Sequence, residues 1–267
     1  MPESPGALPL DVIDLVIAAS LVLVAGLVSL ALRLGLEGRL GLASVRTVVQ
    51  LLLIGYVLEW VFAVDAPWAI LAVIAIMIAA AGRAAVQRAS RTFRGAYPLS
   101  FLSLAVTGTV TTFTVTAAVI GVDPWWRPQY VIPMLGMVLG NSLTGISLCL
   151  DTLLEALDAG RDRIELDLSL GATRWQAVRE PLADAVRRGM IPIINSMMVV
   201  GIVSLPGMMT GQILAGADPL PAVQYQIVVM FMIAAGTSLG CILMALLVYR
   251  RLFNERHQLR SERITER

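Results

Sequence analysis

Seven long apolar segments dominate this chain, and each is long enough to cross a lipid bilayer as a helix. They cover residues 11–32, 47–64, 66–82, 99–121, 130–150, 191–214 and 223–249. A spanning helix needs about 20 mostly apolar residues, because its backbone polar groups must be bonded internally in the hydrocarbon core. Hydrophobic residues make up 57% of the chain. The sequence therefore predicts an all-α polytopic membrane protein with about seven transmembrane helices.

The arginines predict the orientation of these helices. The chain has twenty of them and no lysine. With the N-terminus outside, nineteen arginines fall on the cytosolic side and only Arg127 falls outside, as the positive-inside rule requires. We also expect four arginines of one inner loop to contact anionic head groups. These are Arg83, Arg88, Arg91 and Arg94.

One membrane domain, residues 1–254, accounts for nearly the whole chain, and residues 255–267 form a charged cytosolic tail. The segment 1–10 contains no arginine, so it lacks the basic region of a cleavable signal peptide. His257 is the only histidine, which excludes a histidine-cluster metal site. The sequence contains none of the residue arrangements that are typical of an intramembrane enzyme, so we expect no enzymatic activity in this chain.

The absence of lysine also excludes a Walker A loop, which needs that side chain to hold nucleotide phosphates. We therefore expect no cofactor in this chain. If ATP drives the protein, a separate subunit binds both ATP and Mg.

The polar loop 151–190, between the fifth and sixth predicted spans, is the segment most informative about function. Acidic residues recur along it at Asp151, Glu155, Asp158, Asp162 and Glu165. On one helix they would form a single stripe, either a solvated face or an electrostatic contact for a cytosolic partner. Gly171 then predicts a helix end or turn, and Thr173 is suited to cap a helix beginning near Arg174.

This loop resembles the cytosolic coupling helix of ABC transporter membrane subunits, whose pattern is Glu-Ala-Ala-x-x-x-Gly. Glu165 and Gly171 match its two most distinctive positions. Leu166 and Asp167 replace the two alanines, and no proline follows at the usual distance.

Longer stretches carry a closer resemblance, which runs from about Gly35 to Asn254. They read Arg46-Thr-Val-Val-Gln-Leu-Leu-Leu-Ile-Gly-Tyr56, Ile132-Pro-Met-Leu-Gly-Met137 with Gly140-Asn141, Leu168-Ser-Leu-Gly-Ala-Thr173, and Val203-Ser-Leu-Pro-Gly-Met-Met-Thr-Gly211 with Asp218-Pro219 and Tyr225-Gln226. The chain thereby resembles the FetB-type iron-export permeases, a family related to plant membrane proteins of aluminium tolerance.

The resemblance implies a homodimeric permease of the bacterial inner membrane that works with a FetA-like ATP-binding subunit and exports iron. It also implies that a coupling segment lies in a groove of that subunit. The segment comprises Glu165, Leu166, Leu170, Gly171, Ala172, Thr173 and Trp175. The plant relatives have been linked to aluminium tolerance and nucleotide-sugar transport, so the family does not fix the substrate. We expect the lipid bilayer, and no nucleic acid, as a further partner.

Polar side chains within the predicted spans are candidates for a transport pathway, because polar groups are expensive inside a bilayer. The pathway candidates are Gln50, Asn141 and Gln212. We assign no metal site; the side chains that come closest to one are Glu59, Met134, Met137, Asn141, Met208 and Met209. Thioethers favour Cu(I) over Fe(II), so packing is the alternative role for the methionines. Glu59 lies near a span end, where it can alternatively reach water.

Glycines one helical turn apart predict close packing of the last three spans. The pairs are Gly136 with Gly140, Gly207 with Gly211, and Gly236 with Gly240. In the fifth span we expect Gly136 and Gly140 on the side that can pack tightly, and Met134, Met137, Asn141 and Gly145 on the opposite side, which can line a pathway. Pro206 predicts a weak point or bend in the sixth.

Two other classes of protein remain possible from the sequence. A secondary transporter or channel would need buried acid–base pairs or an inverted repeat, and neither is evident. A membrane receptor or scaffold would need only the spans and the loop. Stable binding of a nucleotide-hydrolysing subunit separates an ABC permease, for iron or for another substrate, from both.

Overall fold

The computed structural model describes residues 11–64, 66–254 and 258–266, so His257 lies outside the described residues. The chain forms two compact units. The first unit comprises residues 1–66 and 211–218, and the second unit comprises residues 67–210 and 219–267. Helices dominate both, which confirms the predicted all-α class.

Six helices of the described chain are long and apolar enough to cross a membrane. They are α1 (Val12–Ala31), α2 (Glu37–Val64), α3 (Pro67–Arg88), α4 (Ala96–Phe113) with its continuation η1 (Thr114–Ile120), α5 (Pro128–Ala159) and α9 (Pro219–Leu252). The continuation η1 is a π-helix. The prediction of a polytopic membrane protein is thus confirmed, and six of the seven predicted spans are single helices.

The remaining predicted span, residues 191–214, is not one helix. Helix α7 (Arg174–Val199) begins well before it, and α8 (Gly207–Leu214) contains its end. Between them, Gly201 adopts a φ of +84° and Pro206 precedes α8 without an N–H to donate. The weak point predicted at Pro206 is thus confirmed, but the prediction of one helix over residues 191–214 was wrong, and the count of seven crossings stays a prediction.

In the first unit, α1 and α2 contact each other across a short connection. The Ser29 hydroxyl closes this connection, because it donates to Glu37 Oε2 at 2.9 Å and accepts from the Leu36 N–H at 3.0 Å. Glu37 is the first residue of α2, where the helix dipole favours a negative charge.

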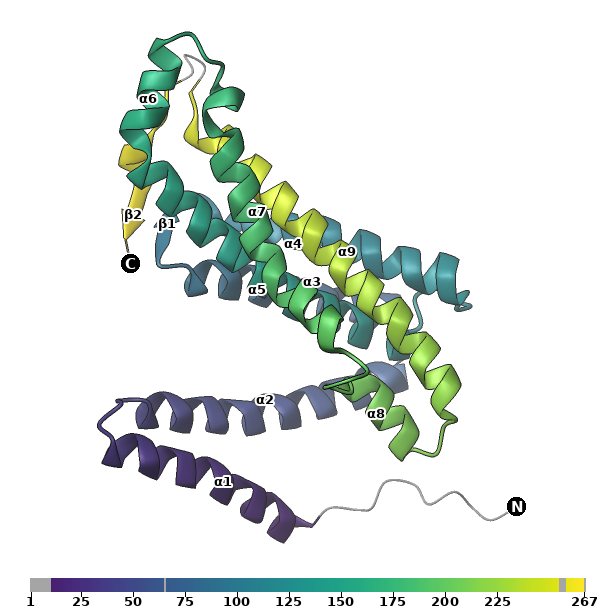
Figure 1. Ribbon diagram of the computed structural model, residues 1–267. Helices are drawn as coiled ribbons and strands as arrows, with labels where there is room; N and C mark the ends of the chain where they lie inside the picture. The colour runs from purple at the N-terminus through teal and green to yellow at the C-terminus, as the bar shows by residue number, and fades with distance from the viewer. Residues whose placement is uncertain (1–10, 65, 255–257, 267) are drawn as a thin grey trace. The chain divides into compact units, whose positions relative to one another are not determined.

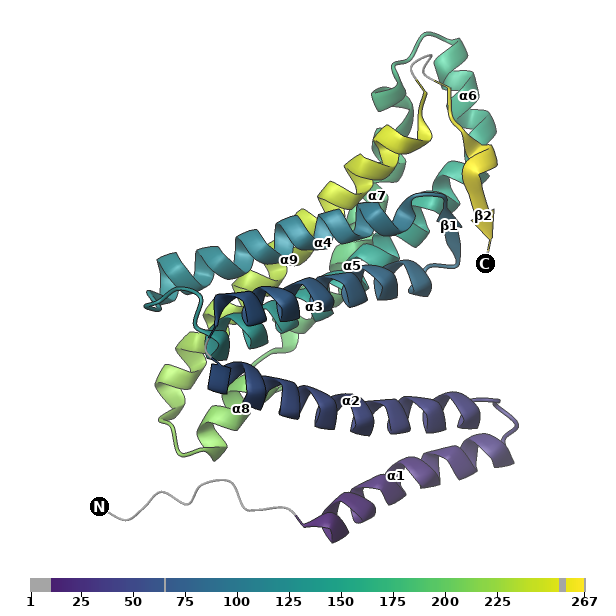
Figure 2. The same ribbon diagram turned by 180° about the vertical axis from the view of Figure 1, so that it is seen from behind.

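In the second unit, α5 is the central helix and contacts α3, α4, α7 and α9 (Figure 1). The view from behind shows α3 and α4 on the other side of α5 (Figure 2). At one end of this unit lie α6 (Arg161–Ser169) and a two-stranded antiparallel sheet of β1 (Arg91–Phe93) and β2 (Ile264–Glu266). A 3-10 turn, η2 (Ser261–Arg263), precedes β2.

Two glycines outside the predicted pairs allow the closest approach in the second unit. A Cβ built on Gly145 would lie 2.8 Å from the carbonyl oxygen of Gly189, and one on Gly189 would lie 2.7 Å from that of Gly145. The backbones of α5 and α7 therefore cross where neither residue has a side chain. Thr237 and Cys241 of α9 close the same contact, with atoms 2.6 and 2.8 Å from these two Cβ positions.

Of the three predicted glycine pairs, only Gly236 with Gly240 has both members in tight contacts with other helices among the described residues. Their Cβ positions fall 2.7 Å from Val138 and 3.0 Å from Ile146 of α5. Gly136 alone of its pair has a Cβ position near another helix, 3.3 Å from Met77 of α3. Gly207 and Gly211 meet nothing within 4 Å among the described residues, and the same holds for Gly140. Gly145, which we expected on the pathway side of α5, instead lies at the tightest contact, so the predicted division of α5 into a packed side and a pathway side was wrong within the described chain.

Hydroxyl side chains line the packed face of α4, a feature that the sequence reading missed. Ser103 donates to the carbonyl oxygen of Gly240 at 2.8 Å and so joins α4 to α9. Thr107, Thr111 and Thr116 bond instead to carbonyl oxygens one turn earlier in their own helix. These internal bonds let threonines lie inside an apolar environment at little cost.

The crossing of α5 and α7 yields a stability prediction. Gly145→Ala should destabilise the second unit by about 1–3 kcal/mol, because the added methyl group overlaps backbone and side-chain atoms that cannot all move. Gly140→Ala is the matched control on the same helix, and its new methyl group meets open space. Thermal unfolding of both purified variants in detergent checks this, and equal melting temperatures would contradict the crossing.

Candidate functional site in the polar segment

The polar segment between α5 and α7 forms two helices rather than one long acidic helix. Helix α5 ends at Ala159, and Gly160 serves both as its C-cap and as the N-cap of α6. The N–H of Gly160 donates to the carbonyl oxygen of Ala156 at 3.0 Å, where a Cβ on Gly160 would lie 2.7 Å away. A glycine at this junction thus allows the chain to leave α5 and begin α6 without a gap.

Gly171 ends α6, as the sequence predicts, and does so through its backbone. Its φ is +92°, in the left-handed region that glycine occupies without strain. The N–H of Gly171 bonds to the Leu168 carbonyl oxygen at 3.1 Å, and the N–H of Ala172 bonds to that of Asp167 at 3.0 Å. This pair of bonds is a Schellman motif, which satisfies the last carbonyl groups of a helix.

Thr173 caps α7, which confirms the predicted start at Arg174. Its hydroxyl oxygen accepts from the Gln176 N–H at 3.3 Å, and the Gln176 side chain accepts from the Thr173 N–H at 2.8 Å. This reciprocal pair is a capping box. The turn from α6 to α7 is therefore fixed at both ends by local hydrogen bonds.

Exposed apolar side chains lie on α6 and its turn. Leu166 and Leu170 have 57% and 77% of their surface exposed, whereas Ile164 is buried. Leu166 and Leu170 are one helical turn apart, so they share a face of α6. An exposed apolar face on a short helix outside the long apolar helices can serve as a contact surface.

The start of α7 is held against the end of α9 by aromatic side chains. Trp175 packs edge-on against Tyr249, with ring centroids 5.7 Å apart, and Tyr249 in turn contacts Phe253 at 5.6 Å. The Arg174 guanidinium lies 5.5 Å from the centre of the Tyr249 ring, within reach of a cation–π contact. Trp175 is thus a supporting residue of the turn that still exposes 44% of its surface.

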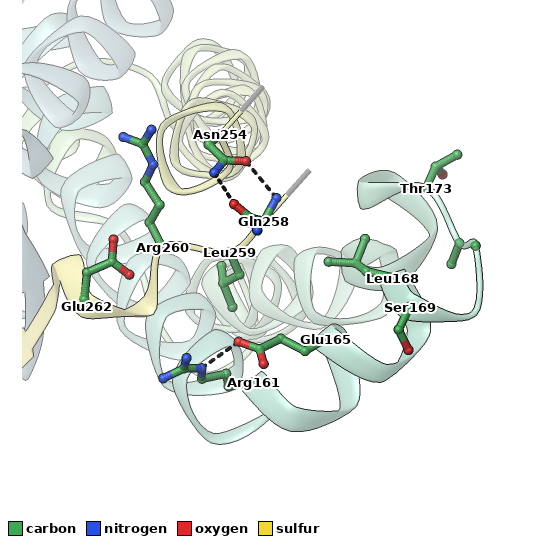
Figure 3. A pocket seen from close by; sticks show the side chains of 12 residues that line it. Arg161, Glu165, Leu168, Ser169, Thr173, Asn254, Gln258, Leu259, Arg260 and Glu262 are labelled. Atoms are coloured by element: carbon green, nitrogen blue, oxygen red, sulfur yellow. Dashed lines mark hydrogen bonds and ion pairs between the residues drawn. The ribbon is translucent and has the colours of Figure 1, made fainter. Parts of the chain in front are cut away.

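A pocket of about 810 Å³ lies between α6 and the C-terminal residues (Figure 3). On the α6 side, Arg161 donates to Glu165 at 2.8 Å. This hydrogen bond, with the charge of Glu165, raises the pKa of Arg161, and Glu262 across the pocket contributes in the same direction. The sequence reading missed this pocket, because the residues facing each other are about a hundred positions apart.

The acidic residues that recur along the polar segment do not all face solvent. Ser90 donates to Asp151 from its N–H at 2.8 Å and from its hydroxyl at 2.6 Å. Arg91 forms ion pairs with Glu155 and Asp158 at 3.9 and 3.7 Å. Three of the five acidic residues therefore contact the segment between α3 and α4 of the same chain.

The pathway and metal candidates are dispersed. Met134 is buried in an apolar cluster with Val138 and Ile193, and Met137 and Met208 pack against that cluster. Met209 is buried as well. Asn141 is exposed, and its side-chain amide donates to the Met137 carbonyl oxygen at 2.9 Å.

The other candidates lie in the first unit. Gln50 and Glu59 are exposed on α2. Gln212 is half-buried in α8, and its Oε1 has no hydrogen-bond partner among the described residues. Across residues 11–64, 66–254 and 258–266, no group of three or more His, Cys, Asp or Glu side chains is placed to hold a metal ion.

Comparison with known proteins places relatives of this chain in bacteria and plants. The sequence profile of the uncharacterised protein family UPF0014 matches residues 12–253. The UPF0014 membrane protein slr1647 of Synechocystis is 42% identical over 217 residues, which cover 81% of this chain and 84% of that protein.

Two further relatives carry functional names. The probable iron export permease protein FetB of Escherichia coli is 38% identical over 215 residues, 80% of this chain and 81% of its own length. The protein ALUMINUM SENSITIVE 3 of Arabidopsis thaliana is 35% identical over 217 residues, 81% of this chain and 78% of its own length. No solved structure matches the chain.

The left-handed conformation at Gly171 yields a local prediction. Gly171→Ala should cost about 1–2 kcal/mol in the α6–α7 turn, because a Cβ is disfavoured at a positive φ even in open space. Gly171→Asn should cost less, since asparagine tolerates this region better. Hydrogen exchange of the amides of residues 170–172 reports the difference. Equal exchange rates in the two variants would contradict the Schellman motif.

Proposed function

Because this chain belongs to the UPF0014 family of membrane proteins, we propose that it is the membrane subunit of an ABC transporter that exports iron from the bacterial cytosol. Two copies of the chain form the permease, and a separate FetA-like subunit binds ATP and Mg and hydrolyses ATP. The observation that carries this proposal is the rigid turn from α6 to α7 with its exposed leucines. The name of the E. coli relative supports iron as the substrate.

The α6–α7 turn has the properties that a coupling element needs. Leu166 and Leu170 expose 57% and 77% of their surface, so burying that surface against a partner would stabilise the complex by about 1–2 kcal/mol each. The Schellman motif at Gly171 and the capping box at Thr173 hold their backbone in place. A partner that presses on this turn therefore acts on α5 and α7 directly, without first ordering a loop.

The sequence supports a separate motor subunit. It has no lysine, so the chain cannot form a Walker A loop; if ATP drives transport, a separate polypeptide binds it. The E. coli relative is named a permease, which agrees with a subunit whose role is transport rather than catalysis.

The arrangement of the second unit supports a cytosolic C-terminus, and the positive-inside rule then puts the N-terminus outside. In the second unit, α6 lies at the same end as the two paired strands (Figure 1). Strand β1 belongs to the segment between α3 and α4, and strand β2 belongs to the C-terminal tail. The arginine-rich segments of the second unit therefore lie at one end of it, which the positive-inside rule assigns to the cytosol.

Transport into inside-out vesicles tests the proposal. With this chain and its ATP-binding subunit present, ATP should drive uptake of radioactive Fe(II). Gly171→Arg should abolish uptake while the protein remains inserted, since a bulky charged residue at a positive φ disrupts the turn. Normal ATP-driven uptake by this variant would refute the coupling role. A stable, ATP-hydrolysing complex without iron uptake would keep the ABC assignment and exclude iron.

Binding of the partner gives a second, independent prediction. Leu170→Asp should weaken binding of the ATP-binding subunit by about tenfold or more, because a charge replaces an apolar contact residue. Leu170→Met is the matched control, since it keeps the apolar surface and should bind normally. Co-purification or calorimetric titration measures both variants. Unchanged affinity of Leu170→Asp would show that this face of α6 does not contact the partner.

A further inference from the structure

The C-terminal residues fold back onto the second unit. The N–H of Arg260 donates to the Leu252 carbonyl oxygen at 2.8 Å, and Leu259 is buried. From there β2 pairs antiparallel with β1, so that Arg91 faces Glu266, Thr92 faces Thr265 and Phe93 faces Ile264. This segment, residues 258–266, is called the tail segment below.

Arg91 is the centre of the contacts that the tail segment makes. Its guanidinium lies 3.2 Å from Glu266 of β2, and also pairs with Glu155 and Asp158 of α5. The side chain is only 20% exposed although all three carboxylates reach solvent. Next to Arg91 in the sequence, Ser90 donates two hydrogen bonds to Asp151, which attach the segment between α3 and α4 to α5. One arginine therefore joins the tail segment to the last turns of α5.

The end of α5 determines where α6 begins. Glu155 and Asp158 lie within the last five residues of α5, and only Gly160 separates α5 from α6. A shift of this end would move α6 with it. Arg91 and β2 thus act on α6 through α5, and α6 and the tail segment line opposite sides of the pocket (Figure 3).

The tail segment also leaves the exposed face of α6 free. Arg161, Glu165 and Leu168 line the pocket on the tail side. At about 100° per residue, Leu166 and Leu170 lie on roughly the opposite side of α6. A partner could therefore contact the leucines while β2 stays paired with β1.

We propose that Arg91 and the strand β2 are positioning elements of the α6–α7 turn: they hold the end of α5, so that force applied to α6 reaches the helices. The inference rests on the proposed function, because it assigns a role to the tail segment in the same coupling device. Arg91 is a positioning residue, since it acts on α6 through Glu155 and Asp158. The tail segment therefore remains docked during transport.

Hydrogen exchange of α6 in the purified full chain tests the positioning role without any partner. Arg91→Gln should speed exchange of the amides of residues 161–169 by about tenfold, as expected when a coupled element loses its support. Arg94→Gln is the matched control, because Arg94 is an exposed arginine three residues away. A chain that ends at Arg260 removes β2 but keeps the bond to Leu252, and should behave like Arg91→Gln. Unchanged α6 exchange in both would overturn the proposal.

A disulfide that locks β2 to β1 tests whether the tail segment stays docked. Thr92 and Thr265 are register partners, and paired residues of antiparallel strands have Cα atoms about 4.5–5.5 Å apart, which suits a disulfide. The native Cys149 and Cys241 are buried and do not compete. The oxidised T92C/T265C variant should retain normal transport per ATP hydrolysed, and the chain ending at Arg260 should lose about tenfold. Transport that stops on oxidation and returns on reduction would show instead that the tail segment must leave.

The two hypotheses fail in different ways. If the unaltered chain neither binds nor responds to an ATP-binding subunit, the proposed function is wrong, and the exchange of α6 still decides the role of Arg91. If ATP drives transport but both Arg91→Gln and the shortened chain transport normally per ATP hydrolysed, only the positioning role is wrong.

Discussion

The crossing of α5 and α7 at Gly145 and Gly189 is the contact on which the second unit depends. Lipid is as apolar as the helix surfaces, so helices in a bilayer associate through close packing rather than through the hydrophobic effect. Here two residues without side chains let the backbones meet, and Cys241 and Thr237 bring α9 to the same place. Because α5 and α7 flank α6 directly in sequence, this crossing also fixes the base from which the polar segment extends.

The polar segment owes its shape to local backbone chemistry more than to its many charges. Exposed ion pairs such as Arg163 with Glu180 contribute about 0–1 kcal/mol each. The turn at Gly171 and the cap at Thr173 instead satisfy backbone groups that would otherwise be unpaired. Arg91 differs from the exposed pairs, since its largely covered guanidinium is shared by three carboxylates from two separate parts of the chain.

The features that could be predicted are those that a short stretch of sequence determines by itself. Apolar length identified six helices, and the stereochemistry of Gly171 and Thr173 located the α6–α7 turn. Pro206 located the weak point of the sixth predicted span, but the full width of the break between α7 and α8 was missed, because average hydropathy does not register a left-handed Gly201. The β1–β2 pair was also missed, since three-residue strands have no usable periodicity and Arg91 was assigned to lipid head groups. Helical spacing grouped Met134 with Asn141, yet neighbouring helices bury the first and leave the second exposed.

The same crossing gives the second unit the mechanics of a lever. Fourteen residues separate Gly145 from Ala159 at the end of α5, about 21 Å along a helix with a rise of 1.5 Å per residue. In the other direction, Met134 lies eleven residues away, about 16 Å from the pivot, in the cluster with Ile193. A tilt of about 5° at the glycines would displace the α6 end by roughly 2 Å and the methionine end by roughly 1.5 Å in the opposite sense. A tilt of α5 about the two glycines would therefore move its two ends together, in opposite directions.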